Sequence, residues 1–573
     1  LKVLIIMRVV DFIVKFLKEK KINDIFMLTG YGAMYLNDAV KIAGINYYAT
    51  RNEATAPSMA SAYARLKNKV GVACVTAGPG ATNALPGLAE AFVDSSPIVI
   101  LSGQVDYKQT THSTQSNKIR SFGTAEINII PIVKPLTKYA EIIKNPRDVR
   151  YILEKAFYLA DSGRKGPVWI DIPLNIQKTE ISEKKLRSFK VKKNININSK
   201  KKLKNNLEKI FRLIQKSNFP ILIVGHGVKQ SGRISEIKKI INILKIPVIF
   251  TRFTNDLVSH DKKFIYGISG IKATKYSKKI MNKADLAISF GCRFSPQFVG
   301  HEFKALSNAK VISVDIEKDE LNKKGQKIDY PLNYDLKDFL PIFLEFFNKK
   351  KLKNFNLWNN HCENLKKKNL IKISNPLKNK KVKAMDLYFF MDRLGKVSSK
   401  KNILITDAGS NYYIGGQVWK FQNDQKEVAS YTNAAMGLSI PLAIGAAVAK
   451  PDSTILAVTG DGSLELNIQE LKTISHNKFN IKLFVINNGG YVSMHNWADT
   501  IFEGRRVDNP VDTGDGTLNL KKIANAFDME HFLISDSKNL DNILKKINSI
   551  KKPLFVEVLT DNKQIIFDAY KDY

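Results

Sequence analysis

The sequence predicts three consecutive α/β domains with mostly parallel sheets. Apolar, strand-like runs alternate with helical segments along nearly the whole chain, which is the pattern of βαβ units. Two lysine-rich polar stretches divide the chain into three blocks. A chain of 573 residues also exceeds a single hydrophobic core, because such cores stop growing near about 250–300 residues. We therefore expect domains at residues 1–176, 209–345 and 381–573, joined by linkers at 177–208 and 346–380.

In the first block, a βαβ unit can be read from the residues. A strand at Val70–Val75 leads through a glycine- and proline-rich turn at Ala77–Gly80 into an alanine-rich helix at Ala81–Phe92. A second strand follows at Ile98–Leu101, and a later strand at Val168–Ile172 ends the block. Because a helix joins the first two strands, we expect them to be parallel.

The middle and third blocks each contain four strand candidates. Glycine immediately follows two strands of the middle block, at Gly225 and Gly291, as in sheets whose carboxyl edge receives a ligand. The middle-block candidates are residues 221–224, 247–250, 286–290 and 311–316. The third-block candidates are residues 402–406, 454–459, 481–486 and 554–558.

The composition excludes several classes of protein. With 44% hydrophobic and 25% charged residues, the chain is not collagen-like, a disulfide scaffold or wholly disordered. The net charge of +37 concentrates in stretches such as 184–204 and 349–383, without the interleaved aromatic residues of a nucleic-acid surface. We therefore expect no nucleic-acid partner, although a steep salt dependence of DNA binding would revive that alternative.

Cysteine spacing and hydropathy bear on the compartment. Cys74, Cys292 and Cys362 lie far apart without the spacing of a disulfide framework or a zinc site, so we expect a reducing cytoplasm. No run of 18 apolar residues occurs, so no membrane span is expected. An amphipathic run follows Met7, and we expect translation to begin there, with residues 1–6 as an upstream extension.

The residues most informative about chemistry follow two neighbouring strands of the third block. The first strand leads into Gly460, Asp461, Gly462 and Ser463. The next strand ends before Asn488 and Gly490. Because both strands of a parallel βαβ unit finish at one sheet edge, Asp461 and Asn488 should lie together. Their side-chain oxygens and a carbonyl near Gly490 are hard ligands, suited to Mg²⁺ that bridges a phosphate group.

The glycines beside Asp461 allow close approach of a diphosphate, and the following helix N-terminus supplies N–H donors. Either motif alone could be an ordinary turn. Their pairing at the ends of adjacent strands favours a combined cation and diphosphate site.

These motifs resemble the signature of thiamin diphosphate enzymes, and the chain is similar nearly end to end to the acetolactate synthase large-subunit family. Further matching segments are residues 51–53, 63–65, 75–83, 94–95, 102–105, 435–437 and 441–445. The resemblance implies the thiamin-diphosphate-binding fold with a Rossmann-like middle domain, and thiamin diphosphate and Mg²⁺ as cofactors. It also implies pyruvate as substrate and a homodimer or tetramer, with a regulatory small subunit left open.

The resemblance implies a role for each matching residue. Glu53 is the catalytic acid/base, which stabilises the imino tautomer at the pyrimidine N1′ and needs apolar surroundings. Met436 holds the cofactor bent, and Pro79 and Asn83 lie beside the pyrimidine. The diphosphate is contacted by Gly409, Ser410 and Asn411 on one side and by Gly460, Asp461, Gly462, Ser463, Asn488 and Gly490 on the other. The metal ligands among these are Asp461, Asn488 and Gly490.

The middle block resembles the FAD-binding domain of the same family. FAD in that domain is largely structural, so its presence would not indicate redox chemistry. The matching residues are Gly225, Gly227, Gly291, Arg293 and Asp315. The family usually carries two acidic residues where this chain has Ser295 and Pro296. A related domain that has lost or changed its nucleotide is therefore the alternative.

Departures from the family bear on the acceptor. Asn52 stands for the usual His, and Ala125 stands for a Gln near the substrate. Residues 487–494 and 505–506 are more similar to a branch associated with surface-polysaccharide sugars. We expect a carboligase that decarboxylates pyruvate and transfers the two-carbon unit to pyruvate, 2-ketobutyrate or a nucleotide-linked keto sugar.

Two other readings are kept. The same fold could serve a simple 2-keto-acid decarboxylase or oxidase, which product analysis would distinguish. A non-catalytic binding subunit is disfavoured, because Glu53, Asp461 and Asn488 are all present.

Overall fold

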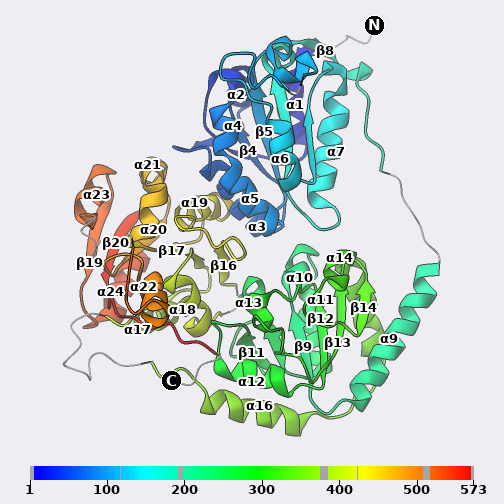
Figure 1. Cartoon of the computed structure of the whole chain (residues 1–573), viewed down its shortest axis with the longest axis vertical. Coiled ribbons are helices and arrows are strands. Elements are labelled where there is room, and N and C mark those ends of the chain that lie inside the picture. The colour runs from blue at the N-terminus through cyan, green and yellow to red at the C-terminus, as the bar shows by residue number, and fades with distance from the viewer. Residues whose placement is uncertain are drawn as a thin grey trace.

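The computed structural model describes residues 6–116, 118–191, 198–373, 385–422, 424–507 and 517–569. The expected extension at residues 1–6 lies, except for Ile6, outside these ranges. Three six-stranded parallel sheets form three α/β domains, which confirms the predicted fold class (Figure 1). The strands predicted above are confirmed, with ends that differ by at most three residues.

The N-terminal domain has the strand order β3-β2-β4-β5-β7-β6. These strands are β2 (Asp24–Met27), β3 (Asn46–Ala49), β4 (Gly71–Val75), β5 (Ile98–Gln104), β6 (Tyr139–Ile142) and β7 (Val168–Pro173). One face packs on α1 (Val9–Glu19), α2 (Met34–Ile42) and α7 (Val149–Asp161). The other face packs on α3 (Thr55–Lys67), α5 (Leu85–Val93) and α6 (Ile129–Val133).

The helix predicted at Ala81–Phe92 differs from the structure. It is divided at Ala84 into α4 (Pro79–Asn83) and α5. Pro86 lies in the first turn of α5, where its missing N–H is tolerated but cannot bond back into a continuous helix. The break lets α4 form a separate short turn beside Glu53.

The middle domain has the strand order β11-β10-β9-β12-β13-β14. These strands are β9 (Pro220–Val224), β10 (Val248–Phe250), β11 (Ile265–Ile268), β12 (Leu286–Phe290), β13 (Lys310–Asp315) and β14 (Tyr330–Asn333). Its helices are α9 (Asn198–Lys216), α10 (His226–Gln230), α11 (Ile234–Leu244), α12 (Lys275–Lys283), α13 (Pro296–Val299), α14 (Lys318–Asn322), α15 (Leu336–Asn348) and α16 (Asn356–Lys368).

The two segments predicted as linkers contain regular structure. In the first, α8 (Leu174–Lys178) is followed by β8 (Glu180–Ser182), which pairs with β1 (Ile6–Arg8), and α9 begins before the segment ends. In the second, α16 buries Trp358 and Cys362 in the core of the middle domain. The lysine-rich composition reflects the solvent-facing sides of these helices, whose other sides are apolar. Residues 192–197 of the first segment and 374–380 of the second lie outside the described residues.

The C-terminal domain has the strand order β16-β15-β17-β18-β20-β19. These strands are β15 (Ile403–Thr406), β16 (Lys426–Ala429), β17 (Ile455–Gly460), β18 (Ile481–Asn487), β19 (Glu530–Ile534) and β20 (Leu554–Leu559). Its helices are α17 (Leu387–Val397), α18 (Ser410–Val418), α19 (Ser439–Ala449), α20 (Asp461–Leu464), α21 (Leu471–His476), α22 (Val492–Ile501), α23 (Leu520–Ala526) and α24 (Leu540–Ser549).

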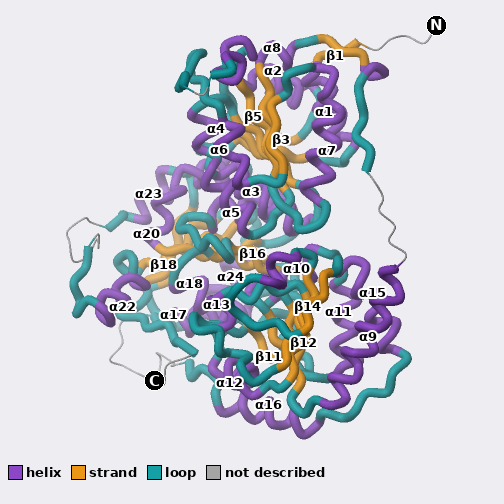
Figure 2. Tube along the Cα trace, turned by 45° about the vertical axis from the view of Figure 1, so that its right-hand side comes forward, coloured by secondary structure: helices purple, strands orange, loops and turns teal. Residues whose placement is uncertain are grey.

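Helices α3 and α19 join the N-terminal and C-terminal domains within one chain. Every residue of α19 is buried, and small side chains let its backbone approach α3 closely. A Cβ added at Gly445 would lie 2.2 Å from the carbonyl oxygen of Met59. In Figure 2 the strands of each domain gather into a central sheet with helices outside it. Within the described ranges, no helix is long and apolar enough to cross a membrane.

Candidate functional site

Asp461 and Asn488 lie together, as the βαβ reading requires. Strands β17 and β18 pair in parallel, with Gly460 opposite Ile486. The Asp461 Oδ2 atom accepts hydrogen bonds from the backbone N–H groups of Asn488, Gly489 and Gly490 at 3.1, 3.0 and 2.9 Å. This carboxylate thus fixes the loop that follows β18 at the carboxyl edge of the sheet.

The oxygen atoms at this edge could bind a hard cation only together with oxygens from a bound phosphate group. Among the described residues, no group of three or more His, Cys, Asp or Glu side chains could hold a metal. A cation here would rely on Asp461, an amide or backbone oxygen of the 488–490 loop, and oxygens from a bound phosphate. That mixed set is how proteins commonly hold Mg²⁺.

Two glycines beside this cluster have backbones that are not closely packed. A Cβ added at Gly460 would have its nearest neighbour at 4.0 Å, and one at Gly409 would have its nearest at 3.8 Å. Gly409 also has a φ of +92°, which disfavours other residues. A Cβ at Gly462, by contrast, would lie 2.5 Å from the Tyr491 ring, so this glycine permits close packing. Gly409 and Gly460 thus allow a ligand to approach the backbone.

Asp407 organises this edge and is absent from the residues predicted above. Its Oδ2 accepts from the Thr459 hydroxyl at 2.9 Å and the Gly437 N–H at 3.2 Å. Its Oδ1 accepts from the Asn411 side chain at 3.2 Å. Since Gly437 follows Met436, this carboxylate fixes the Met436 loop against β15 and β17. The available signal was its position: Asp407 directly follows the strand predicted at 402–406.

The hydrogen bond from Asn411 to Asp407 limits which atoms of Asn411 could contact a diphosphate. Its side-chain amide is buried and donates to Asp407. The backbone N–H groups of Ser410 and Asn411, in the first turn of the nine-residue helix α18, are therefore the donors able to face an anion.

Burial raises the pKa of Asp407 to about 7 from 3.8, against the effect of its hydrogen-bond donors. Between those values the folded state binds more protons than the unfolded state, so this group lowers stability as the pH rises through that window. An Asp407→Asn variant cannot ionise. We therefore expect the difference in melting temperature, variant minus wild type, to grow as the pH rises from about 4 to about 8. Thermal scans at several pH values measure it. The exposed Asp452→Asn is the matched control, and a pH-independent difference for Asp407→Asn would contradict this expectation.

Glu53 lies in the N-terminal domain, just before α3, and contacts the α4 turn. The Asn83 side chain donates to Glu53 Oε2 at 2.8 Å and to Asn52 Oδ1 at 2.9 Å. A Cβ at Gly80 would come within 3.1 Å of Glu53 Oε1. The structure therefore brings Glu53 and Asn83 together beside the turn that begins at Pro79, where Glu53 is half-buried and Asn83 is exposed.

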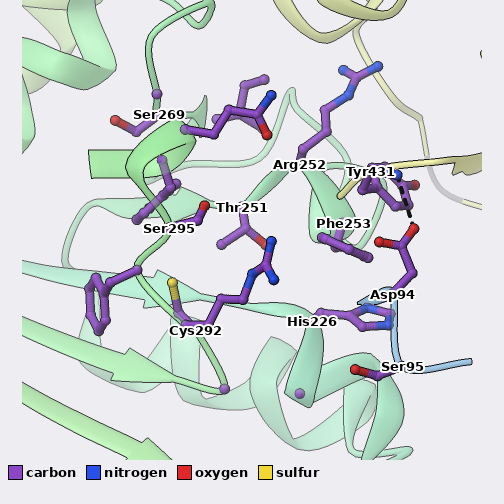
Figure 3. Close-up of a pocket in the computed structure, with 18 of the residues that line it drawn as sticks. Asp94, Ser95, His226, Thr251, Arg252, Phe253, Ser269, Cys292, Ser295 and Tyr431 are labelled. Atoms are coloured by element: carbon purple, nitrogen blue, oxygen red, sulfur yellow. Dashed lines mark hydrogen bonds between the residues drawn. The ribbon is translucent and has the colours of Figure 1, made fainter. Parts of the chain in front are cut away.

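A cavity is lined mostly by the middle domain, and residues of the other two domains complete its wall (Figure 3). Gly227, Gly291, Arg293 and Asp315 are among the residues that line it. Gly225 instead permits close packing, since its added Cβ would lie 2.1 Å from the Gly291 carbonyl oxygen. Aromatic residues from two domains complete part of the wall: Phe253, Tyr412, Tyr413 and Tyr431.

Several buried polar atoms at this cavity lack a hydrogen-bond partner in the part of the chain that the structure describes. Among the described residues, the buried Nδ1 of His226 and the Nε and Nη1 of Arg252 have no hydrogen-bond partner, although Arg252 Nη2 pairs with Glu427. Burial, with nearby cations, holds the pKa of His226 well below its usual range. Burial also raises the pKa of Asp315. Donors without partners beside aromatic rings are the features expected of a site for an aromatic, anionic ligand.

Asp94 connects this cavity to the C-terminal domain. Its carboxylate accepts from the backbone N–H groups of Tyr431 and Thr432, each at 3.0 Å. Figure 3 shows Asp94 directed at the Tyr431 backbone, with His226 and Phe253 alongside. The segment that leads from β16 to Met436 is thus fixed from the N-terminal domain.

Comparison with known proteins gives the class that this fold and site define. The chain matches three family models: "Thiamine pyrophosphate enzyme, N-terminal TPP binding domain" at residues 7–124, the "central domain" at 207–342 and the "C-terminal TPP binding domain" at 407–558. The chain therefore belongs to the thiamine pyrophosphate enzyme family, whose cofactor is thiamin diphosphate. Its relatives place it more narrowly among enzymes of the acetolactate synthase type.

Three such relatives are similar over most of their length. A probable acetolactate synthase large subunit of Methanococcus aeolicus is 30% identical, covering 96% of this chain and 91% of the relative. Acetolactate synthase large subunits of Lactococcus lactis and Cyanidium caldarium are each 29% identical, covering 96% of this chain and 92% of each relative. The predicted resemblance is confirmed.

Proposed function

We propose that this enzyme decarboxylates pyruvate and transfers the two-carbon unit to a second keto compound, with Mg²⁺ beside thiamin diphosphate. The observation that carries the proposal is that the Asp461 carboxylate binds the 488–490 loop, beside the loosely packed glycines Gly409 and Gly460. This edge has the backbone access and hard oxygens that a diphosphate and its cation need.

Each predicted residue has a part in the proposal. Asp461, the Asn488 side chain and the Gly490 carbonyl hold Mg²⁺, while Gly462 and Ser463 shape the turn after β17. Ser410 and Asn411 face the diphosphate from α18, and Met436 supports the cofactor's bent form. When bound, thiamin diphosphate supplies the electron sink for decarboxylation. Glu53 holds the proton at the pyrimidine N1′, with Pro79 and Asn83 beside the ring.

We further propose that two copies of the chain share each site. Glu53 of one subunit would face Asp461 of the other, so a homodimer is the minimal catalytic unit and a tetramer is compatible with it. The half-buried Glu53 of a single chain supports this arrangement, because a carboxylate acting as an acid/base needs further desolvation. A regulatory small subunit is compatible with the same assembly.

The loop at residues 111–126, which the resemblance places near the substrate, bears on the choice between acceptors. Glu126 is buried, and its carboxylate accepts hydrogen bonds from the Thr111 N–H and the Phe122 N–H, each at 3.0 Å. These bonds hold the two ends of the 111–122 segment together. Ala125, in that loop, has a φ of +55° and a methyl group where the family has an amide. A second pyruvate would give 2-acetolactate. The smaller residue favours, as the second candidate, a bulkier acceptor such as a nucleotide-linked keto sugar.

The middle-domain cavity fits a flavin nucleotide with a structural role. The His226 and Arg252 nitrogens that have no partner within the described ranges could hold a diphosphate together with Arg293. Phe253 and the tyrosines could pack on flat rings. Purified protein with the visible absorption of flavin would support FAD, whereas failure to bind added FAD would contradict it.

The proposed function is tested by supplying pyruvate with and without thiamin diphosphate and Mg²⁺, alongside a panel of acceptors, and identifying products by mass. We expect CO₂ release and a carboligated product only when both cofactors are present. A chelator should abolish activity, and excess Mg²⁺ should restore it. Aldehyde or acetate as the sole product would indicate a decarboxylase or oxidase, and absence of CO₂ release under every condition would overturn the proposal.

A further inference from the structure

A buried carboxylate of the C-terminal domain binds the turn that carries Glu53 in the same chain. Glu470 lies at the end of the segment that begins with Asp461, and its side chain is fully buried. Its Oε1 accepts from the backbone N–H groups of Arg51 and Asn52 at 2.8 and 3.1 Å. The Thr55 hydroxyl, on the other side of Glu53, lies 2.8 Å from the same oxygen.

The second oxygen of Glu470 is also satisfied. The Thr473 hydroxyl lies 2.7 Å from Oε2 and 3.2 Å from the carbonyl oxygen of Ala49, at the end of β3. Oε1 thus contacts the segment from Arg51 to Thr55 directly, whereas Oε2 contacts Thr473, whose hydroxyl also lies near Ala49. Burial raises the pKa of Glu470, while these donors oppose that effect. A carboxylate in such a place is costly unless it is fully hydrogen-bonded, as it is here.

Holding the two domains together does not require this carboxylate. The apolar contact of α3 with α19 already joins them through a continuous core. Glu470 instead orients the backbone. By accepting from the consecutive N–H groups of Arg51 and Asn52, it fixes two peptide planes that precede Glu53. Glu470 ends the segment 461–470. The first residue of that segment, Asp461, fixes the 488–490 loop through its carboxylate.

We propose that Glu470 is a positioning residue that orients the turn carrying Glu53 in the same chain. This inference rests on the proposed function, in which Glu53 and Asp461 of one chain serve different sites of a dimer. Glu470 does not touch the reacting atoms. It acts on Glu53 through the backbone of Arg51 and Asn52.

The first test uses cofactor-free protein and hydrogen exchange read by mass spectrometry. We expect Glu470→Ala to raise exchange in peptides covering residues 49–55, because it removes the acceptor of the Arg51 and Asn52 N–H groups, without a similar rise in peptides of α19. Glu470→Gln keeps one acceptor oxygen and should restore much of the protection. The matched control is Asp528→Asn, which removes an exposed carboxylate that pairs with Lys472 on α21. Unchanged exchange at 49–55 in Glu470→Ala would overturn the inference.

The second test uses mixed dimers, purified through two different tags, of a Glu53→Gln chain and an Asp461→Ala chain. In such a dimer one site carries both changes and the other carries neither, so activity should return. Glu470→Ala is then added to either chain. We expect a loss on the order of 100-fold, the effect of a misplaced catalytic group, only when it lies in the chain that retains Glu53.

The outcomes separate the two proposals. No activity in the starting mixed dimer would overturn the shared site itself. Restored activity that falls equally whichever chain carries Glu470→Ala, or falls only with the Glu53→Gln chain, would overturn the positioning role. Glu470→Gln in the Glu53-retaining chain should stay within about tenfold of the unmodified mixed dimer, since it keeps an acceptor.

Discussion

Replacing Glu53 with Gln is expected to lower the rate of pyruvate decarboxylation by about 10²–10⁴-fold, the usual contribution of a positioned acid/base. Gln keeps the size of the side chain and can still meet the Asn83 amide, which donates to Glu53 at 2.8 Å. It cannot take or release a proton. The rate constant should therefore fall while thiamin diphosphate still binds.

Steady-state rates and cofactor titration together measure this effect. The control is Glu19→Gln on α1, an exposed carboxylate 4.0 Å from Lys15, which should change neither quantity. Decarboxylation at the wild-type rate by Glu53→Gln would remove Glu53 from the chemistry. A loss of cofactor affinity alone would give it a binding role instead.

The backbone of this site was predictable because parallel strands impose short-range rules. Buried strands such as β17 and β18 are recognisable as apolar runs. Because the two strands run in the same direction, Asp461 lies beside Asn488. Two local signals were misread. The lysines of α16 concealed an apolar side that includes Trp358. Pro86, which begins α5 as a separate helix after Ala84, was read as part of one continuous helix.

The side-chain networks were not predictable from one sequence. Glu470 meets Arg51 across 419 positions, and Asp407 meets Thr459 across 52. Neither pair has a local pattern, since each depends on how sheets and domains come together. Local rules thus locate the groups that face a ligand, whereas the groups that orient them appear only in the folded chain.

Arg65 is another residue whose partners come together only in the folded chain. It is the cation of a buried cluster between the N-terminal and C-terminal domains. Its side chain is 9% exposed, and it pairs with Glu90 at 3.2 Å and Asp94 at 3.5 Å, both fully buried. It also donates to the Ala429 carbonyl oxygen at 2.8 Å, at the end of β16. Removing one partner leaves uncompensated charge in the interior, so Arg65→Met should destabilise the fold by about 3–5 kcal/mol.

The pH dependence identifies the source of that loss. Burial raises the pKa of both Glu90 and Asp94, while Arg65 lowers it, so without Arg65 both carboxyl groups should hold their protons to higher pH. At low pH the protonated groups carry no charge to compensate, and the variant should approach wild type in urea unfolding. As the pH rises the gap should widen, because the folded variant binds more protons than the unfolded chain. Arg187→Met, which removes an exposed pair with Asp148, should cost less than about 1 kcal/mol at every pH. A constant gap for Arg65→Met would show that lost packing, not buried charge, is the cause.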